Sequence, residues 1–330
     1  MCGLLNIVAL DGYTVNPGDL SWEPIEKLGE LTVHARTDQA EVVGRAVDAD
    51  ILLTNKVPIG EAELAQLPRL KMIVVTATGY NVIDVDAARR RGIPVCNAPE
   101  YSTRSVAQHV FAMILSYLHQ PAQHDAAVRR GDWMKAGEFS FWLKPIEELV
   151  DQTMGIIGYG KIGQAVGKLA TAFGMQVLAY SPRPREEEFP EVGWVDRDVL
   201  LGSADLVTLH CPQTAETTDM VNADFLARMK SSAILINASR SGLVVEADLV
   251  EALRQKRIQA ALLDVASTEP IEDDNPLLGL ENCLITPHVG WASLASRRRL
   301  VEVTANNIRA FLSSEPIHVV NGVTPGSGPA

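Results

Sequence analysis

The chain has 330 residues, of which 47% are hydrophobic and 21% charged. This length and composition predict two ordinary folded cores and exclude a peptide hormone or a disulfide miniprotein. The 29 basic side chains against 41 acidic ones give a net charge of −12. A surface of that sign repels phosphate backbones and anionic lipid, so the composition predicts no nucleic-acid and no membrane partner.

The cysteine pattern is typical of reduced thiols in a cytoplasmic protein, and it predicts no metal site. No C-x-x-C pair occurs, and no histidine stands at ligand spacing from Cys2, Cys96, Cys211 or Cys283. The apolar run at residues 4–10 lacks a basic flank and is too short for a signal peptide or a membrane span. We expect it to be a first buried strand.

Over the first hundred residues, short apolar runs alternate with helix-like stretches. This alternation indicates α/β architecture, with parallel strands covered by helices on both faces. The expected strands are 4–10, 31–34, 51–54, 72–76 and 94–96, and the expected helices include 24–29 and 84–91.

A longer helix is expected at 102–119, because serine and threonine cap candidates precede an apolar period. The following arm, 120–150, has neither a helical nor a strand period, yet it contains Trp133, Phe139 and Trp142. Bulky aromatic side chains on an irregular arm usually pack against another surface. The arm therefore favours a homodimer.

A second alternation begins near residue 151 and predicts six strands with crossover helices, which is a complete doubly wound dinucleotide-binding fold. The expected strands are 153–157, 176–180, 206–210, 233–237, 260–265 and 283–286, and the expected helices are 162–173, 224–229 and 246–256. A last helix at 291–312 precedes a Gly/Pro-rich tail at 324–330, which we expect to fray.

A Gly-x-Gly-x-x-Gly turn lies between the strand at 153–157 and the helix at 162–173. In such a turn the first glycine permits the tight bend, the second lets the backbone approach a pyrophosphate, and the third lets helix and strand pack closely. The helix N-terminus then offers unpaired N–H groups to the anion. The alternative is a purely structural turn. The predicted cofactor contacts here are Gly158, Tyr159, Gly160, Lys161, Ile162 and Gly163.

The end of the next strand favours NADP over NAD. An acidic residue usually stands there to hold the ribose hydroxyls, whereas this chain has Ser181, followed by Arg183. A hydroxyl does not repel a 2′-phosphate, and an arginine can pair with it. The alternative is a solvated loop whose arginines balance the glutamates at 186–188, with NAD as the cofactor.

Three polar residues each follow a strand of the second series: Arg240, Glu269 and His288. Ligands of an open α/β sheet bind beyond the carboxyl ends of the strands, so these side chains are expected to converge. Histidine suits proton transfer near neutrality, a carboxylate can orient its ring, and arginine can hold a substrate carboxylate. Singly, each residue could equally be a core histidine, a surface acid or a surface cation.

With these residues identified, the sequence resembles the D-isomer-specific 2-hydroxyacid dehydrogenase family over nearly its whole length. The motifs that carry the resemblance are 158–163, 237–242, 263–270 and 286–288. The resemblance implies Arg240 as substrate clamp, Glu269 as histidine partner and His288 as acid/base. It further implies that Asp264 lies near the nicotinamide carboxamide.

The resemblance also extends to the first domain and to further cofactor contacts. The loop 76–81 resembles the family loop whose backbone N–H groups grip the substrate carboxylate, with an ordinary strand-to-helix turn as the alternative. The implied substrate contacts there are Ala77, Thr78 and Gly79. The other implied cofactor contacts are Val106, His210, Cys211, Pro212, Thr217, Asn237, Ala238, Ser239 and Gly290.

Within the family, the runs 77–81, 101–103 and 105–109 and Trp291 most resemble glycerate dehydrogenase, also called hydroxypyruvate reductase. Ser241 departs from the family by replacing the glycine that normally follows the arginine. Formate dehydrogenase is disfavoured because its relatives carry glutamine at the position of Glu269.

The resemblance implies reduction of hydroxypyruvate or glyoxylate to a D-2-hydroxy acid by hydride transfer from NADPH or NADH. It places the substrate-binding domain, a flavodoxin-like fold, at 1–100 and 290–330, with the Rossmann domain inserted at 101–289. The alternative is a non-catalytic dinucleotide sensor resembling the dehydrogenase-like co-repressors, which keep the same three polar residues. The lack of long disordered flanks argues against it.

Overall fold

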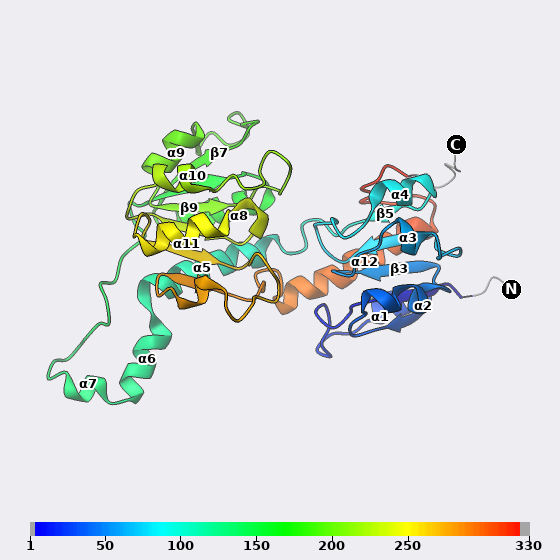
Figure 1. The fold of residues 1–330 in the computed structure, drawn as a ribbon, viewed down its shortest axis with the longest axis horizontal. Coiled ribbons are helices and arrows are strands. Elements are labelled where there is room, and N and C mark those ends of the chain that lie inside the picture. The colour runs from blue at the N-terminus through cyan, green and yellow to red at the C-terminus, as the bar shows by residue number, and fades with distance from the viewer. Residues whose placement is uncertain (1–3, 324–330) are drawn as a thin grey trace. The chain divides into compact units, whose positions relative to one another are not determined.

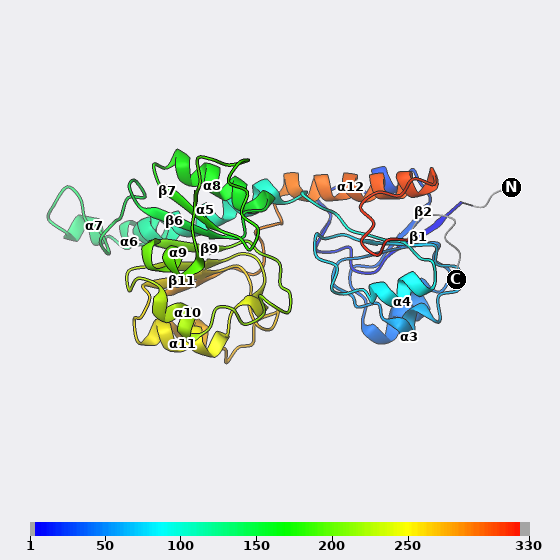
Figure 2. The ribbon, with the colours of Figure 1, turned by 90° about the horizontal axis from the view of Figure 1, so that it is seen from above.

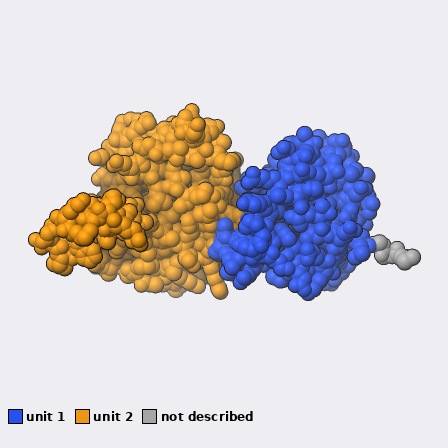
Figure 3. Space-filling model, turned by 90° about the horizontal axis from the view of Figure 1, so that it is seen from below, with its two compact units in different colours: residues 1–102, 292–330 blue, residues 103–291 orange. Residues whose placement is uncertain are grey.

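A computed structural model describes residues 4–323, which fold as two compact units, coloured separately in Figure 3. Unit 1 combines the chain up to Ser102 with the chain from Ala292 onward, and unit 2 is Thr103–Trp291. Both junctions lie two residues beyond the expected boundaries, 100/101 and 289/290. Cys2 and the tail at 324–330 lie outside the described residues.

Unit 1 is a parallel sheet with helices on both faces. Its strands are β1 (Asn6–Ala9), β2 (Glu30–Val33), β3 (Ile51–Thr54), β4 (Met72–Val75) and β5 (Val95–Cys96). Its helices are α1 (Glu23–Glu26), α2 (Val42–Ala46), α3 (Glu61–Leu64), α4 (Val85–Arg90) and α12 (Leu294–Leu312). The strand order β2-β1-β3-β4-β5 is the flavodoxin-like order. Figure 2 shows α12 on one face of this sheet and α3 and α4 on the other, which explains why every residue of β3 and β4 is buried.

Unit 2 is built on a larger sheet, which is also entirely parallel. Its strands are β6 (Thr153–Ile157), β7 (Gln176–Tyr180), β8 (Gly193–Trp194), β9 (Leu206–Leu209), β10 (Ile234–Asn237), β11 (Ala260–Leu263) and β12 (Cys283–Ile285). Its sheet-covering helices are α5 (Thr103–His119), α8 (Lys161–Ala172), α9 (Arg197–Ser203), α10 (Ala223–Arg228) and α11 (Glu246–Arg254).

The strand order of unit 2 is β12-β11-β10-β9-β6-β7-β8. The order reverses between β6 and β9, and ligands of such sheets bind at the carboxyl ends of the strands at this switch point. The doubly wound fold is therefore confirmed, but the expected count of six strands was wrong. The additional strand is β8, whose two residues, Gly193–Trp194, are too few to show a strand period.

Two apolar layers cover the sheet of unit 2. One contains Val207 and Leu209 with residues of α9, α10 and α11. The other contains Leu206 and Ile156 with residues of α5 and α8. Figure 2 shows these two sets of helices on opposite faces of the sheet. Because both faces are buried, the strands read as continuous apolar runs, and their carboxyl ends are held by a packed core.

The arm at 120–150 is partly helical, so the prediction of an irregular segment was wrong for its first half. It contains α6 (Pro121–Arg129) and α7 (Asp132–Lys135), which project from the rest of unit 2 in Figure 1. The only buried residue of α6 is Ala127, so this helix has no apolar face from which a helical period could be recognised. Phe139 and Trp142, further along the arm, are 89% and 64% exposed.

The described residues contain no helix that is long and apolar enough to cross a membrane, and they hold no group of three or more His, Cys, Asp or Glu arranged to bind a metal ion. Cys96, Cys211 and Cys283 are free thiols. Burial raises the pKa of Cys96 and of Cys283 to about 12, so neither is a reactive thiolate near neutrality.

Candidate active site

The glycine turn after β6 lies at the switch point of the unit 2 sheet. Gly158 has φ +92°, and a Cβ there would lie 2.5 Å from the nitrogen of Cys211 and 2.7 Å from the carbonyl carbon of His210. A Cβ on Gly163 would collide with the carbonyl oxygen of Gly158. Only glycine fits these two positions, because any side chain would push apart the backbone of β6, α8 and the segment after β9.

Gly160 differs from its two neighbours, because the space above it is open. Its φ of −75° is ordinary, and apart from its two chain neighbours no described residue lies within 4 Å of an added Cβ. It is the N-cap of α8 and has no side-chain cap, and no described residue accepts from its N–H. A free N–H at the positive end of a helix dipole is an anion site, so the turn fits the diphosphate of a dinucleotide.

The side chain of Tyr159 does not belong to this anion site. It is buried and packs edge-on against Phe189 and Trp194, with ring centroids 5.4 and 5.5 Å away. Burial and the nearby Glu191 raise the pKa of Tyr159. Only the backbone of Tyr159 therefore lies at the turn, and its side chain anchors the turn to the apolar core of unit 2.

The two arginines after β7 have different surroundings. Arg185 donates from Nη2 to the carbonyl of Tyr159 at 2.8 Å, and its guanidinium lies 4.9 Å from the ring centroid of Phe189. Arg183 is exposed, and its side chain makes no hydrogen bond or ion pair with a described residue. Ser181 is half-buried, and its hydroxyl accepts the N–H of Arg183 at 3.4 Å. Arg185 therefore braces the phosphate turn while Arg183 is free to bind an anion, a difference that their spacing did not reveal.

The segment after β9 presents its backbone to the glycine turn. The imidazole of His210 bonds back to the hydroxyl of Thr208 through Nε2 at 2.9 Å, and its Nδ1 is buried without a partner among the described residues. Burial lowers the pKa of His210 to about 4, so the ring is neutral near pH 7. Beyond it, the hydroxyl of Thr217 donates to the carbonyl of Pro212 at 2.7 Å and closes the loop.

Asn237 shapes the loop that carries Arg240. Its buried side chain donates to the carbonyl of Arg240 at 2.8 Å and accepts the N–H of Ser239 at 3.0 Å. The hydroxyl of Ser239 in turn donates to the carbonyl of Cys211 at 3.0 Å. Among the described residues, the guanidinium of Arg240 bonds only to the carbonyl of Ser239, at 2.7 Å, so most of its donors are available to a ligand.

Glu269 and His288 come together as the sequence predicts. His288 Nδ1 lies 2.8 Å from Glu269 Oε2, while Nε2 of the same ring contacts no described partner. His288 follows β12, Glu269 follows β11, and Arg240 follows the adjacent β10. Three neighbouring strand ends thus supply an oriented imidazole, the carboxylate that orients it, and a guanidinium.

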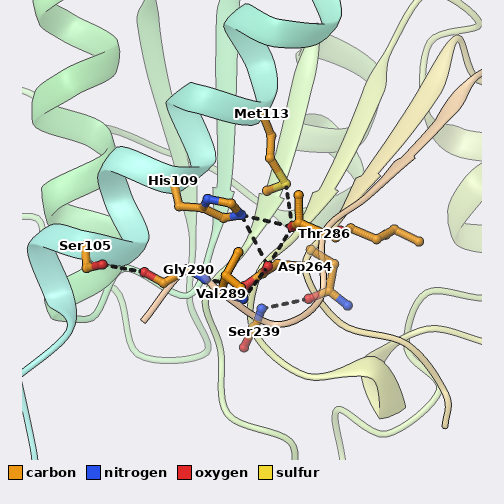
Figure 4. A network of polar contacts seen from close by, with 10 residues as sticks. Ser105, His109, Met113, Ser239, Asp264, Thr286, Val289 and Gly290 are labelled. Carbon is orange, nitrogen blue, oxygen red and sulfur yellow. Dashed lines mark hydrogen bonds and ion pairs between the residues drawn. The ribbon is translucent and has the colours of Figure 1, made fainter. Parts of the chain in front are cut away.

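Asp264 follows β11 and is only 2% exposed. Its carboxylate accepts from Thr286 Oγ1 at 2.6 Å, Val289 N at 2.9 Å and Gly290 N at 2.8 Å, and His109 Nε2 lies 3.2 Å away (Figure 4). Burial opposes ionisation, but these hydrogen bonds outweigh it and hold the pKa of Asp264 below its usual value. Both carboxylate oxygens are therefore engaged within the protein.

His109 and Thr286 both contact Asp264, although the sequence predicts no role for either side chain. His109 lies in α5, far from Asp264 along the chain, and no local pattern marks a helical histidine as a partner of a strand-end carboxylate. Val106, one turn before His109, is buried at 6% exposure.

In unit 1, the loop after β4 offers free backbone donors. The hydroxyl of Thr78 donates to the carbonyl of Ala98 at 3.0 Å, and Asn97 donates to the carbonyl of Thr78 at 2.7 Å. No described residue accepts from the N–H groups of Thr78 and Gly79. The carbonyl of Ala77 accepts the N–H of Ala98 at 2.9 Å, which fixes the start of this loop.

A doubly wound sheet, a glycine turn at its switch point and an oriented histidine beyond its strands define a dinucleotide-dependent dehydrogenase. Residues 111–290 match the family model described as D-isomer specific 2-hydroxyacid dehydrogenase, NAD binding domain. The chain belongs to the D-isomer-specific 2-hydroxyacid dehydrogenase family, as the sequence motifs predict, and it is an enzyme that binds a nicotinamide dinucleotide.

Named relatives cover almost the whole chain. Hydroxypyruvate reductase of Blautia hydrogenotrophica is 47% identical over 321 residues, which are 96% of this chain and 100% of that protein. Glycerate dehydrogenase of Methylorubrum extorquens is 41% identical over 85% of this chain and 88% of its own length. The structure of an NADPH-dependent glyoxylate/hydroxypyruvate reductase of Sinorhizobium meliloti, in complex with NADP and malonate, gives a TM-score of 0.84 at 28% identity and covers 98% of both chains.

Proposed function

We propose that the enzyme reduces hydroxypyruvate or glyoxylate to a D-2-hydroxy acid with NADPH. The observation that carries the proposal is the 2.8 Å contact between His288 Nδ1 and Glu269 Oε2, next to the strand end that bears Arg240. The names of the relatives, hydroxypyruvate reductase and glycerate dehydrogenase, support this substrate class.

The proposed chemistry divides the work among these side chains. Glu269 accepts from Nδ1 and fixes the ring, so the proton delivered to the substrate oxygen leaves from Nε2 of His288. Arg240 pairs with the substrate carboxylate, which the free N–H groups of Thr78 and Gly79 also bind. When bound, the reduced nicotinamide supplies the hydride that C2 of the keto acid receives. In this proposal unit 1 is the substrate domain and unit 2 the cofactor domain.

The cofactor contacts proposed from the sequence are consistent with the geometry of the turn. Gly160 offers an open approach and a free N–H for the diphosphate. Ser181 presents a hydroxyl rather than a carboxylate, and the unpaired Arg183 is available for a 2′-phosphate. We therefore assign NADP as the preferred cofactor over NAD. The variant Ser181→Asp is expected to shift preference toward NADH, because its carboxylate repels the 2′-phosphate.

The test is a spectrophotometric assay of reduced-cofactor oxidation with hydroxypyruvate, glyoxylate and pyruvate, each with NADPH and with NADH. We expect the first two substrates to be reduced, with NADPH preferred. His288→Ala is expected to lower turnover by about 10²–10⁴-fold, the usual contribution of general acid catalysis. Retention of more than about a tenth of wild-type turnover would contradict the acid role. Absence of oxidation with all three keto acids would contradict the proposed substrate class.

We also propose that the enzyme is a cytoplasmic homodimer, with the arm of unit 2 in the dimer interface. Trp133, Met134, Phe139 and Trp142 expose large apolar side chains on one projecting segment, and exposed apolar patches of this kind usually mark an interface. The unpaired Cys96, Cys211 and Cys283 fit a reducing compartment. A monomer mass in light scattering would contradict the dimer.

A further inference from the structure

The α5 helix is linked to the loop that carries His288 by a chain of hydrogen bonds, drawn in Figure 4. The Thr286 hydroxyl has one hydrogen, and it donates this hydrogen to Asp264 Oδ1 at 2.6 Å, because an ionised carboxylate can only accept. The Thr286 oxygen therefore accepts from His109 Nε2, 3.0 Å away. It follows that Nε2 of His109 carries a hydrogen, and that His109 acts as a donor toward both Thr286 and Asp264.

The same carboxylate fixes the backbone directly after His288. Val289 and Gly290 both donate their N–H groups to Asp264, at 2.9 and 2.8 Å. His288 itself has φ +53°, a left-handed conformation that a residue with a Cβ keeps only when its surroundings enforce it. The two amide hydrogen bonds to Asp264 are such an enforcement.

The α5 helix grips this loop at a second point. The hydroxyl of Ser105 donates to the carbonyl of Gly290 at 2.6 Å. A Cβ on Gly290 would lie 2.8 Å from Asp264 Oδ2 and 3.2 Å from Cδ2 of His109, so the loop, the carboxylate and the imidazole are in close contact at this point. A change at His109 is therefore transmitted to the loop rather than absorbed by a void.

We propose that His109 is a positioning residue for His288. It holds the Asp264 carboxylate in the orientation that anchors the amides of Val289 and Gly290, and these amides keep the His288 ring against Glu269. The inference rests on the proposed role of His288 as the acid. His109 is not a catalytic residue in this scheme, because it acts on the reaction only through Asp264.

The proposal predicts a particular pH dependence. The side chains that donate to the Asp264 carboxylate are His109 and Thr286, and Glu269 is the charged group that contacts His288. Burial alone disfavours the charged form of Asp264, and the hydrogen bond from His109 is the largest effect opposing it. Without that donor the pKa of Asp264 rises. Once protonated, the carboxyl group loses acceptor capacity for the two amides, so the loop loses its anchor at a higher pH than in the wild type.

Two substitutions of His109 separate positioning from simple packing. His109→Gln retains an N–H donor at the place of Nε2, and His109→Leu fills a similar volume without one. We expect His109→Leu to lower kcat by about 10- to 100-fold, as small misplacements of an acid do, and to move the acid limb of its pH profile upward. We expect His109→Gln to stay near wild type in kcat and in its pH profile.

The outcomes distinguish this inference from the proposed function. If the wild type reduces no keto acid, or if His288→Ala stays active, the proposed function fails. If those two controls behave as expected but His109→Leu keeps the wild-type kcat and pH profile, the inference alone fails. Equal losses in the Gln and Leu variants, without a shift of the acid limb, would likewise show that His109 only packs. If His109→Leu does not fold, Thr286→Val replaces it as the test, because it removes the hydroxyl between His109 and Asp264 at nearly constant volume. The acid limb of the pH profile of Thr286→Val must then also move upward, and an unmoved limb would contradict the inference.

Discussion

The substitution Gly160→Ala isolates the role of the phosphate turn in binding from its role in folding. The φ of −75° suits alanine, and apart from the two neighbouring residues no described residue lies within 4 Å of the added methyl group. Replacing glycine at a compatible φ stabilises by about 0.4–1 kcal/mol, and this gain is offset because alanine is a poorer N-cap than glycine. The free energy of unfolding should therefore change by no more than about 0.5 kcal/mol.

The cofactor, by contrast, should bind more weakly to this variant. The methyl group occupies the space through which the diphosphate approaches the N–H of Gly160, and overfilling a close contact costs about 1–3 kcal/mol. This cost corresponds to a rise in the Kd for NADPH of roughly 5- to 150-fold. Fluorescence titration with NADPH measures the Kd, and urea unfolding measures the stability.

Gly158→Ala is the matched control on the same turn. Its φ of +92° and the backbone atoms 2.5 and 2.7 Å from an added Cβ predict a loss of about 2–5 kcal/mol in unfolding free energy, from left-handed strain and overpacking together. The reasoning is refuted if Gly160→Ala binds NADPH within twofold of wild type, or if Gly158→Ala unfolds at the wild-type urea midpoint.

Three further predictions concern the cofactor pocket, the buried histidine and the arm. Arg183→Ala should raise the KM for NADPH about tenfold, because one charge-assisted pair is lost, and should leave the KM for NADH unchanged. Arg185→Ala should weaken the binding of both cofactors, because Arg185 braces the turn. Equal effects of Arg183→Ala on the two KM values would contradict this assignment. Burial lowers the pKa of His210 from 6.5 to about 4, so the unfolded chain binds this proton more readily. The free energy of unfolding should then fall by up to about 3 kcal/mol as pH drops through that window, and urea unfolding of His210→Gln should show a correspondingly flatter profile. Trp142→Glu should shift light scattering toward the monomer mass, while Leu278→Glu, an exposed change outside the arm, should not.

Much of the fold follows from local patterns in the sequence. The strands β3, β6 and β7 have the bounds that their apolar runs predict, because a strand buried on both faces needs consecutive apolar residues. The glycine turn, Arg240, Glu269 and His288 are also recognisable, since parallel strands bring their carboxyl ends to one edge of the sheet whatever the details of packing. The contact between Glu269 and His288 could be predicted from topology, because the two residues follow neighbouring strands of the sheet.

Other features depend on contacts between residues that are distant in the chain. No local pattern predicts β8, whose two residues form a strand only because β7 offers them a hydrogen-bonding edge. Nor does spacing show that Arg185 turns to Tyr159 while Arg183 remains free. His109 meets Asp264 because α5 packs on the face of the sheet toward which Asp264 and Thr286 point. Periodicity determines which segments become strands and helices, whereas the direction and partner of each polar side chain are set only when these elements pack.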